Sequence, residues 1–134
     1  AGLVHSDRPV IAFAGDGDFL MNGQEIATAK QYDLNVVFIV VNNGMYGTIR
    51  MHQEREYPGR VSATQLINPD FAAYARAFGC HGEVVDRTAD FASAFERARD
   101  VDGPALIELR IDTEAITPAT SLSAIRAAAE KRQI

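Results

Sequence analysis

Two short runs of wholly apolar residues constrain the fold more than any other feature of the sequence. Residues 10–14 (VIAFA) and 36–41 (VVFIVV) have the length of strands, and neither alternates polar with apolar side chains. A strand without a polar face has to be covered on both sides, as in a parallel sheet between two layers of helices. Both runs fall far short of the roughly 20 apolar residues of a membrane helix, so a membrane-spanning role is excluded.

Helices are predicted between and after these strands. Helix-forming residues over 23–32 join the first strand to the second, and apolar residues recur at helical spacing over 71–78 and 91–98. A shorter helical candidate covers 48–54, inside a stretch that is otherwise predicted to be loop, and a last helix covers 121–131.

The predicted helices begin at capping residues. Asn68 precedes Pro69 and is expected to cap the helix that starts there, with the proline as its first residue. Thr88 is expected to cap the next helix. Two further strands are predicted at 83–85 and 105–111. Strands and helices therefore alternate, which indicates an α/β fold: a layered parallel sheet with right-handed crossovers and helices on both faces.

The size and charge of the chain limit the classes of partner that we expect it to bind. Its 134 residues suit a single domain over 1–134, and 18 acidic against 13 basic residues leave a net charge of −5. We therefore expect neither nucleic acid nor a membrane as partner. The single cysteine, Cys80, cannot form an internal disulfide, which favours a cytoplasmic location. The chain opens on Ala1 rather than methionine, so we expect a fragment of a longer protein.

Polar residues stand where the two apolar strands end, and in parallel sheets ligands bind beyond that edge. Residues 15–18 (GDGD) follow the first strand and residues 42–45 (NNGM) follow the second. The carboxylate of Asp16, the amide oxygen of Asn43 and the backbone carbonyls after it suit Mg²⁺ or Ca²⁺ and suit zinc poorly. Such an ion keeps about three positions open, which a diphosphate can fill.

The backbone around the first strand end favours a bulky anion. Gly15 and Gly17 let the main chain approach it closely. The helix expected to begin near residues 22–23 would turn its free N–H groups toward the same place. One acid, one metal ion and one helix terminus together predict a phosphorylated cofactor.

At this point the sequence resembles a known family. Residues 15–17 (GDG), then 24 residues, then Asn42 and Asn43 resemble the signature of thiamine-diphosphate-dependent enzymes. Residues 15–46 as a whole are similar to the acetolactate synthase and pyruvate decarboxylase branch, and the resemblance covers nearly the entire chain. It implies that residues 1–134 are the diphosphate-binding domain of that fold, truncated at its N-terminus, and the C-terminal domain of a longer multidomain subunit.

The resemblance also implies a site. Asp16 and Asn43 would bind Mg²⁺ through side-chain oxygens and Met45 through its backbone carbonyl, while Gly17 and Asp18 would contact the diphosphate through backbone N–H groups. Many relatives have serine in place of Asp18, and a carboxylate there would repel the diphosphate unless it turned outward, so a side-chain role for Asp18 is not expected. The predicted cofactor-binding residues are Gly15, Asp16, Gly17, Asp18, Asn43 and Met45, of which Asp16, Asn43 and Met45 bind the metal.

The substrate side is less defined, because the tryptophan common in acetolactate synthases beyond Gly47 is absent from this sequence. Tyr46, Arg50, His52 and Gln53 are candidates to face the substrate, although a mobile polar loop would have the same composition.

By the same resemblance the full protein is a lyase or transferase that decarboxylates a 2-oxo acid and releases, oxidises or ligates the remaining fragment. Its partners would be a small 2-oxo acid or aldehyde, the remaining domains of the subunit, and further copies in a homodimer or homotetramer. The glutamate that activates the cofactor is expected outside this chain, so the isolated chain should be inactive. FAD is a possible further cofactor, and it would bind in the family's middle domain, outside this chain.

Two other functions are compatible with parts of this pattern. A Mg²⁺-dependent phosphatase also places an acidic loop at a strand end, but the first predicted strand supplies no DxD nucleophile. A non-catalytic assembly domain that retains the fold and the metal site is the other alternative, and finding the activating glutamate in the parent sequence would exclude it.

Overall fold

The computed structural model describes residues 1–5 and 8–132 of the chain. Internal contacts divide the chain into two compact units. Residues 1–42 and 68–110 form the sheet unit, and residues 43–67 and 111–134 form the helical unit.

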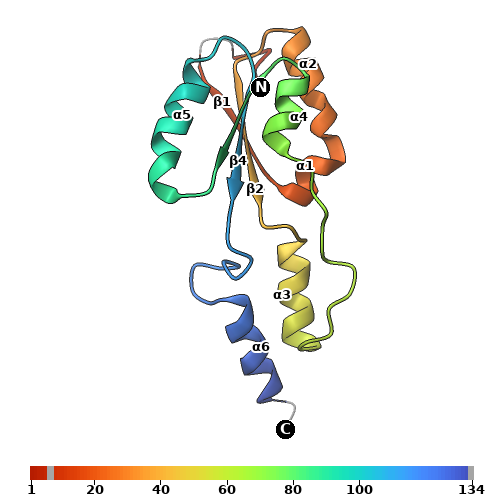
Figure 1. The fold of residues 1–134 in the computed structure, drawn as a ribbon. Coiled ribbons are helices and arrows are strands. Elements are labelled where there is room, and N and C mark those ends of the chain that lie inside the picture. Colours follow the sequence, from red (N-terminus) through yellow and green to blue (C-terminus); the bar gives the residue numbers. More distant parts are fainter. Residues whose placement is uncertain (6–7, 133–134) are drawn as a thin grey trace. The chain divides into compact units, whose positions relative to one another are not determined.

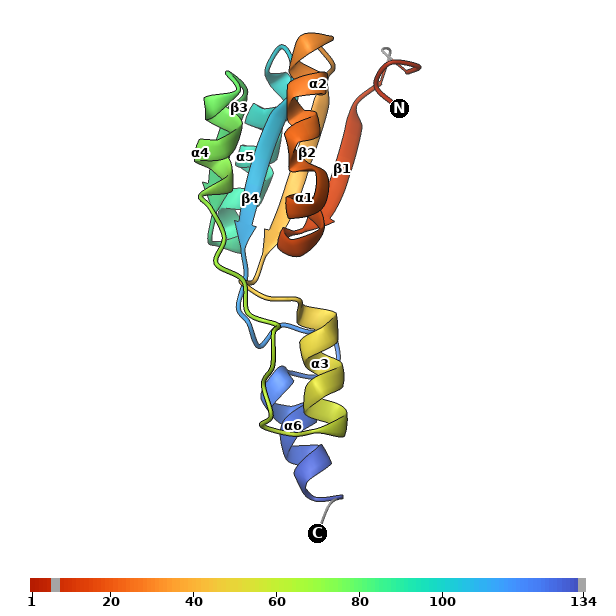
Figure 2. The ribbon, with the colours of Figure 1, turned by 90° about the vertical axis from the view of Figure 1, so that its right-hand side faces the viewer.

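The sheet unit is built on parallel strands in the order β1-β2-β4-β3. Figure 2 shows β1 at one edge of this sheet. The expected strands are confirmed, and β3 begins two residues earlier than predicted. The strands are β1 (Val10–Gly15), β2 (Val36–Asn42), β3 (His81–Val85) and β4 (Ala105–Arg110).

Helices cover both faces of the sheet, which confirms the predicted fold class. Figure 1 shows α5 (Phe91–Asp100) on one face, with α1 (Asp16–Asn22), α2 (Ile26–Gln31) and α4 (Phe71–Ala77) on the other. A short 3₁₀ helix, η1 (Gly23–Glu25), joins α1 to α2.

Two apolar cores, one on each side of the sheet, explain why β2 has no polar face. Val40 and Leu106 pack with Phe19 and Phe71 beneath the helices α1, α2 and α4. Their strand neighbours Ile39 and Ile107 point the other way and pack beneath α5. Because successive strand residues alternate between the faces, a strand covered on both sides has to be apolar throughout. For β1 the predicted cover on both sides was wrong: β1 is an edge strand, and its Ile11 and Phe13 side chains are 48% and 68% exposed.

The first helix begins earlier than expected. We placed its start near residues 22–23, and this was wrong: α1 begins at Asp16, directly after β1. Gly and Asp are typical turn residues, so the pattern of residues 15–18 does not by itself predict the start of a helix. In the structure Gly15 has the extended backbone of an N-cap, with φ −70° and ψ 163°, and the two acidic residues of the first turn, Asp16 and Asp18, complement the helix dipole.

Two predicted caps were also wrong. Asp70, not Asn68, caps α4, because the Asp70 side chain accepts a hydrogen bond from the N–H of Ala73 at 2.7 Å. Pro69 therefore lies before the helix rather than within it. Thr88 is the first residue of a 3₁₀ turn, η2 (Thr88–Asp90), and α5 starts after it.

The helical unit contains two longer helices that pack against each other (Figures 1 and 2). These are α3 (Gly47–Glu56) and α6 (Leu122–Glu130), close to the predicted 48–54 and 121–131. Ser121 caps α6 by accepting from the N–H of Ala124 at 3.2 Å. Among the described residues, none of the helices combines the length and the apolar character needed to cross a lipid bilayer.

Candidate functional site

Asp16 lies at the carboxyl end of β1, as the first residue of α1. Its side chain is buried, with 3% of its surface exposed. One carboxylate oxygen, Oδ1, accepts a hydrogen bond from the N–H of Gly17 at 2.9 Å, and Oδ2 accepts from the amide Nδ2 of Asn68 at 2.7 Å. The carboxylate is therefore held in one orientation by donors on both oxygens.

Asn42, the last residue of the neighbouring strand β2, lies at the same end of the sheet as Asp16. Gly15 and Val41 are paired across β1 and β2, so the residues that follow them, Asp16 and Asn42, leave adjacent strands together as expected. The Nδ2 of Asn68 also donates to Oδ1 of Asn42 at 2.8 Å. Asn68 thus bridges the ends of the two strands.

A buried carboxylate on β4 completes this network. Glu108 is 1% exposed, and its Oε1 accepts from Nδ2 of Asn42 at 2.9 Å and from Nε of Arg110 at 2.9 Å. Its Oε2 accepts from the backbone N–H of Phe71, at the start of α4, at 3.1 Å. The Glu108 carboxylate raises the pKa of the Arg110 guanidinium through their hydrogen bond. A buried charge with an ion-pair partner and several donors is one that a folded protein can retain.

The start of α1, residues 15–18, contains two acids that have different surroundings. Gly17 is buried beside Asp16, whereas Asp18 is exposed. The Oδ2 of Asp18 accepts from the N–H of Gly15 at 3.2 Å, which is the hydrogen bond by which an acidic residue in the first turn caps its own helix. The Asp18 carboxylate thus has a structural role.

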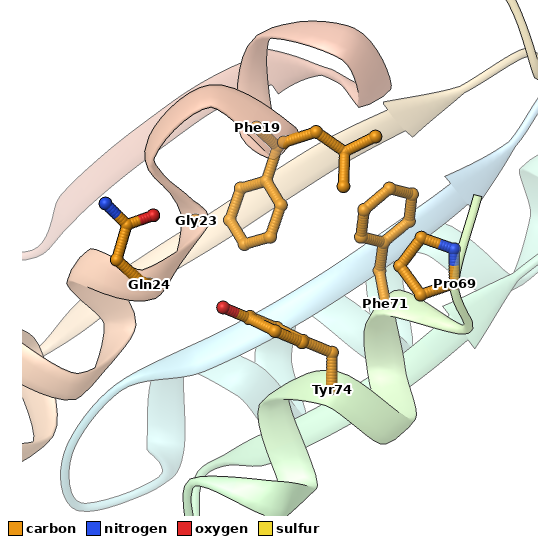
Figure 3. Close-up of a pocket in the computed structure, with 7 residues that line it drawn as sticks. Phe19, Gly23, Gln24, Pro69, Phe71 and Tyr74 are labelled. Carbon is orange, nitrogen blue, oxygen red and sulfur yellow. The ribbon is translucent and has the colours of Figure 1, made fainter. Parts of the chain in front are cut away.

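Aromatic packing fixes α1, and with it Asp16, against the rest of the sheet unit. The ring of Phe19 meets those of Phe71 and Tyr74 edge to face, with centroids 5.5 and 6.1 Å apart. Figure 3 shows these rings around a small cavity of about 60 Å³ between α1 and α4. A Cβ atom at Gly23 would lie 2.6 Å from the Phe19 ring, so the chain needs glycine where α1 ends.

The other two predicted metal ligands lie in the helical unit, just after β2. The side chain of Asn43 is half-buried, and its Oδ1 accepts from the N–H of Met45 at 3.1 Å. An amide oxygen has a second lone pair, so this hydrogen bond leaves Asn43 able to bind a cation. Met45 is 8% exposed and pairs with Gln65 as an isolated antiparallel bridge.

The four substrate-side candidates lie at or within α3, and two of them are engaged inside the helical unit. Arg50 is buried and pairs with Glu54, and Gln53 donates to the carbonyl of Ser62 at 2.6 Å. Tyr46 is the N-cap residue of α3, and His52 is exposed. Their assignment to a substrate stays a prediction.

No three His, Cys, Asp or Glu side chains gather into a metal-binding group within residues 1–5 and 8–132. The ligand set predicted from the sequence, in which Asp16 is the one carboxylate, is not a group of that kind and stays a prediction.

Sequence reasoning missed two members of the network, Asn68 and Glu108. Glu108 had a signal, since it is the one acidic residue inside the apolar run 105–109. Asn68 was interpreted as a helix cap, and only its contacts across 52 residues of sequence reveal its place beside Asp16.

Comparison with known proteins gives a consistent result. Residues 1–109 match the model of the family described as thiamine pyrophosphate enzyme, C-terminal TPP binding domain. The chain is 36% identical over 113 residues to the acetolactate synthase isozyme 2 large subunit of Escherichia coli (strain K12), covering 84% of this chain and 21% of that protein. It is 43% identical over 90 residues to the acetolactate synthase large subunit of Parasynechococcus marenigrum (strain WH8102), covering 65% and 15%.

Solved structures with a similar fold include two decarboxylases. The benzoylformate decarboxylase of Polynucleobacter necessarius superposes with a TM-score of 0.77 at 28% identity, over 87% of this chain and 22% of that one. The thiamine diphosphate-dependent 4-hydroxybenzoylformate decarboxylase of Rhodococcus jostii RHA1 gives 0.77 at 35% identity, over 84% and 21%. The chain spans about a fifth of the length of these relatives.

Proposed function

This chain belongs to the thiamine pyrophosphate enzyme family through that family's C-terminal TPP-binding domain, and we propose that it holds thiamine diphosphate through Mg²⁺. The full protein would be an acetolactate synthase-like decarboxylase or carboligase. The named relatives are acetolactate synthases and 2-oxo acid decarboxylases, which supports this class of reaction.

The observation that carries the proposal is the buried, oriented carboxylate of Asp16. A carboxylate that is 3% exposed and held by two N–H donors is pre-organised to bind a cation. The donor types fit Mg²⁺, since Asp16 supplies a carboxylate, Asn43 an amide oxygen and Met45 a carbonyl. The buried Oδ1 of Asn68 has no hydrogen-bond partner among the described residues, which leaves an acceptor beside Asp16 for a bound donor.

We assign roles to the predicted residues accordingly. Asp16 and Asn43 would bind the metal through side-chain oxygens and Met45 through its carbonyl. Gly15 and Gly17 would admit the diphosphate to the backbone, and Asp18 would contribute its N–H, because its carboxylate already accepts from Gly15. When bound, the cofactor supplies a carbon nucleophile and an electron sink for 2-oxo acid chemistry, while this chain binds and orients it.

The remaining features of the proposal concern the full protein. A small 2-oxo acid or aldehyde would be the substrate, with Tyr46, Arg50, His52 and Gln53 as candidates on its side. The activating glutamate, and FAD if it is used, would belong to other domains. Assembly as a homodimer or homotetramer and a cytoplasmic location complete the proposal.

The phosphatase alternative finds no support in the geometry. Asp16 and Asp18 are spaced as two carboxylates with one residue between them, but the Asp18 carboxylate accepts from the N–H of Gly15 rather than standing beside a nucleophile. The assembly-domain alternative makes the same binding prediction, and the presence of the activating glutamate in the parent protein decides it.

Calorimetry with Mg²⁺ and thiamine diphosphate tests the proposal. We expect the chain to bind the cofactor only when Mg²⁺ is present, and Asp16→Ala to abolish that binding. Asp100→Ala, which removes an exposed carboxylate on α5, is the matched control and should bind normally. Binding that needs no Mg²⁺, or that survives in Asp16→Ala, would contradict the proposal.

A further inference from the structure

The side chain of Asn68 has a position that helix capping does not explain. It lies two residues before Asp70, which caps α4, so Asn68 is not needed for that role. Its amide group instead donates one hydrogen bond to Oδ2 of Asp16, at 2.7 Å, and one to Oδ1 of Asn42, at 2.8 Å. Both amide hydrogens are thereby used.

The orientation of the Asn68 amide is determined by the buried carboxylate of Glu108. A carboxylate only accepts hydrogen bonds, so Asn42 has to turn its NH₂ group toward Glu108 and its oxygen toward Asn68. Asn68 then has to present its own NH₂ group to Asn42 and Asp16. The opposite rotamer would place an amide oxygen against the Asp16 carboxylate, without a hydrogen between them.

This network is anchored to rigid elements. Glu108 is on β4 and accepts from Arg110 and from the first N–H of α4, while Asn42 ends β2 and Asp16 follows β1. The hydrogen bonds therefore tie three neighbouring strands and the start of α4 to one carboxylate. Partners that orient a metal ligand in this way set its metal affinity.

We propose that Asn68 is a positioning residue for the metal ligand Asp16, with Asn42 and Glu108 fixing the direction of its amide. The inference rests on the proposed function, in which Asp16 binds Mg²⁺. A ligand held in one orientation favours the near-octahedral geometry of Mg²⁺ over the looser coordination of Ca²⁺. Asn68 therefore contributes to the choice of metal as well as to its affinity.

The test compares Asn68→Ala with a matched control, Asn35→Ala. Asn35 is an asparagine of the same unit whose Oδ1 accepts one backbone hydrogen bond, from Gly103 at 2.9 Å, and it precedes β2 rather than following it. The affinities for Mg²⁺ and for Ca²⁺ are each measured by calorimetry in the presence of thiamine diphosphate. Metal-free stability is measured by urea unfolding.

In Asn68→Ala we expect the Mg²⁺ affinity to fall about 10- to 100-fold, the range for losing a partner of a metal ligand. The Ca²⁺ affinity should fall less, so that the Mg²⁺ to Ca²⁺ ratio decreases. Asn35→Ala should leave both affinities unchanged. Asn68→Ser, which keeps a hydroxyl at the position, serves if the alanine variant does not fold, and should change the ratio in the same direction.

An Mg²⁺ affinity of Asn68→Ala within about twofold of that of the unmodified chain would overturn the inference. Equal losses of Mg²⁺ and Ca²⁺ affinity, accompanied by a matching loss of stability in the metal-free variant, would overturn it as well. The proposed function itself fails, and this inference with it, if the unmodified chain does not bind Mg²⁺ in the presence of the cofactor. The same holds if Asp16→Ala binds Mg²⁺ as tightly as the unmodified chain. Loss of binding in Asp16→Ala together with normal binding in Asn68→Ala rejects the role of Asn68 alone.

Discussion

Arg126 on α6 donates two hydrogen bonds to Glu54 on α3, from Nε to Oε2 at 2.8 Å and from Nη2 to Oε1 at 2.6 Å. The Glu54 carboxylate is fully buried, and it also accepts from Arg50, one turn earlier on α3, and from the N–H of Gly59 at 2.8 Å. One carboxylate thus joins both helices of the helical unit to the loop that follows α3.

Removing that charge should destabilise the helical unit. We expect Glu54→Gln to lower its free energy of unfolding by about 3 kcal/mol, the lower end of the range for breaking a buried ion pair, because Arg50 would stay buried without its partner. Arg126 is 37% exposed, so solvent screening reduces its share of the loss. Hydrogen exchange of the α3 and α6 amides measures the effect. Arg55→Gln, which removes a charge at an exposed position of the same helix, is the control, and a loss as small as the control's would contradict the prediction.

The same carboxylate should make the helical unit sensitive to acid. The hydrogen bonds from Arg126 hold the pKa of Glu54 below its ordinary value, despite the opposing effect of burial. A carboxyl with a lowered folded pKa stabilises the fold above its unfolded pKa, and this contribution is lost as the pH falls through the folded value. The protection factors of the α6 amides, which are corrected for the slower intrinsic exchange at low pH, should therefore fall on acidification. Glu54→Gln should weaken that dependence, and an unchanged pH profile in the variant would rule out this origin.

A backbone contact between α4 and β3 gives a third prediction. A Cβ atom at Gly82 would lie 2.2 Å from the carbonyl oxygen of Ala72, so α4 would have to move away from the sheet. Since Ala72 is fully buried, we expect Gly82→Ala to cost about 3 kcal/mol or more, as overpacked core positions do. Urea unfolding measures the loss. Gly2→Ala, where the nearest atom is 3.4 Å away, should cost little, and equal losses in the two variants would contradict the steric explanation.

The sequence predicts the order and position of the strands well, for physical reasons. The runs at 10–14 and 36–41 are both strands, but only the second is covered on both faces, because β1 lies at the edge of the sheet with Ile11 and Phe13 exposed. Gly15, Asp16 and Asn42 follow from where the two strands end. The resemblance carried by residues 15–46 is confirmed by the family match over residues 1–109. The contacts of Asn68 with Asp16 and of Glu108 with Asn42 could not be predicted, because folding brings these residues together from distant parts of the sequence. Glu108 and Asn42 are separated by 66 residues of sequence.

The residues at the starts of α4 and α5 show that residue type alone does not identify a helix cap. They also give a last prediction. Asn68, Asp70 and Thr88 are all residue types that cap helices, but only the Asp70 side chain accepts from its helix. Asp70→Ala should therefore lower the free energy of unfolding by about 1 kcal/mol. Thr88→Ala, at an exposed position whose side chain caps neither η2 nor α5, should change it very little. Thermal unfolding of both variants measures the difference, and a loss in Thr88→Ala as large as in Asp70→Ala would mean that Thr88 caps α5 after all.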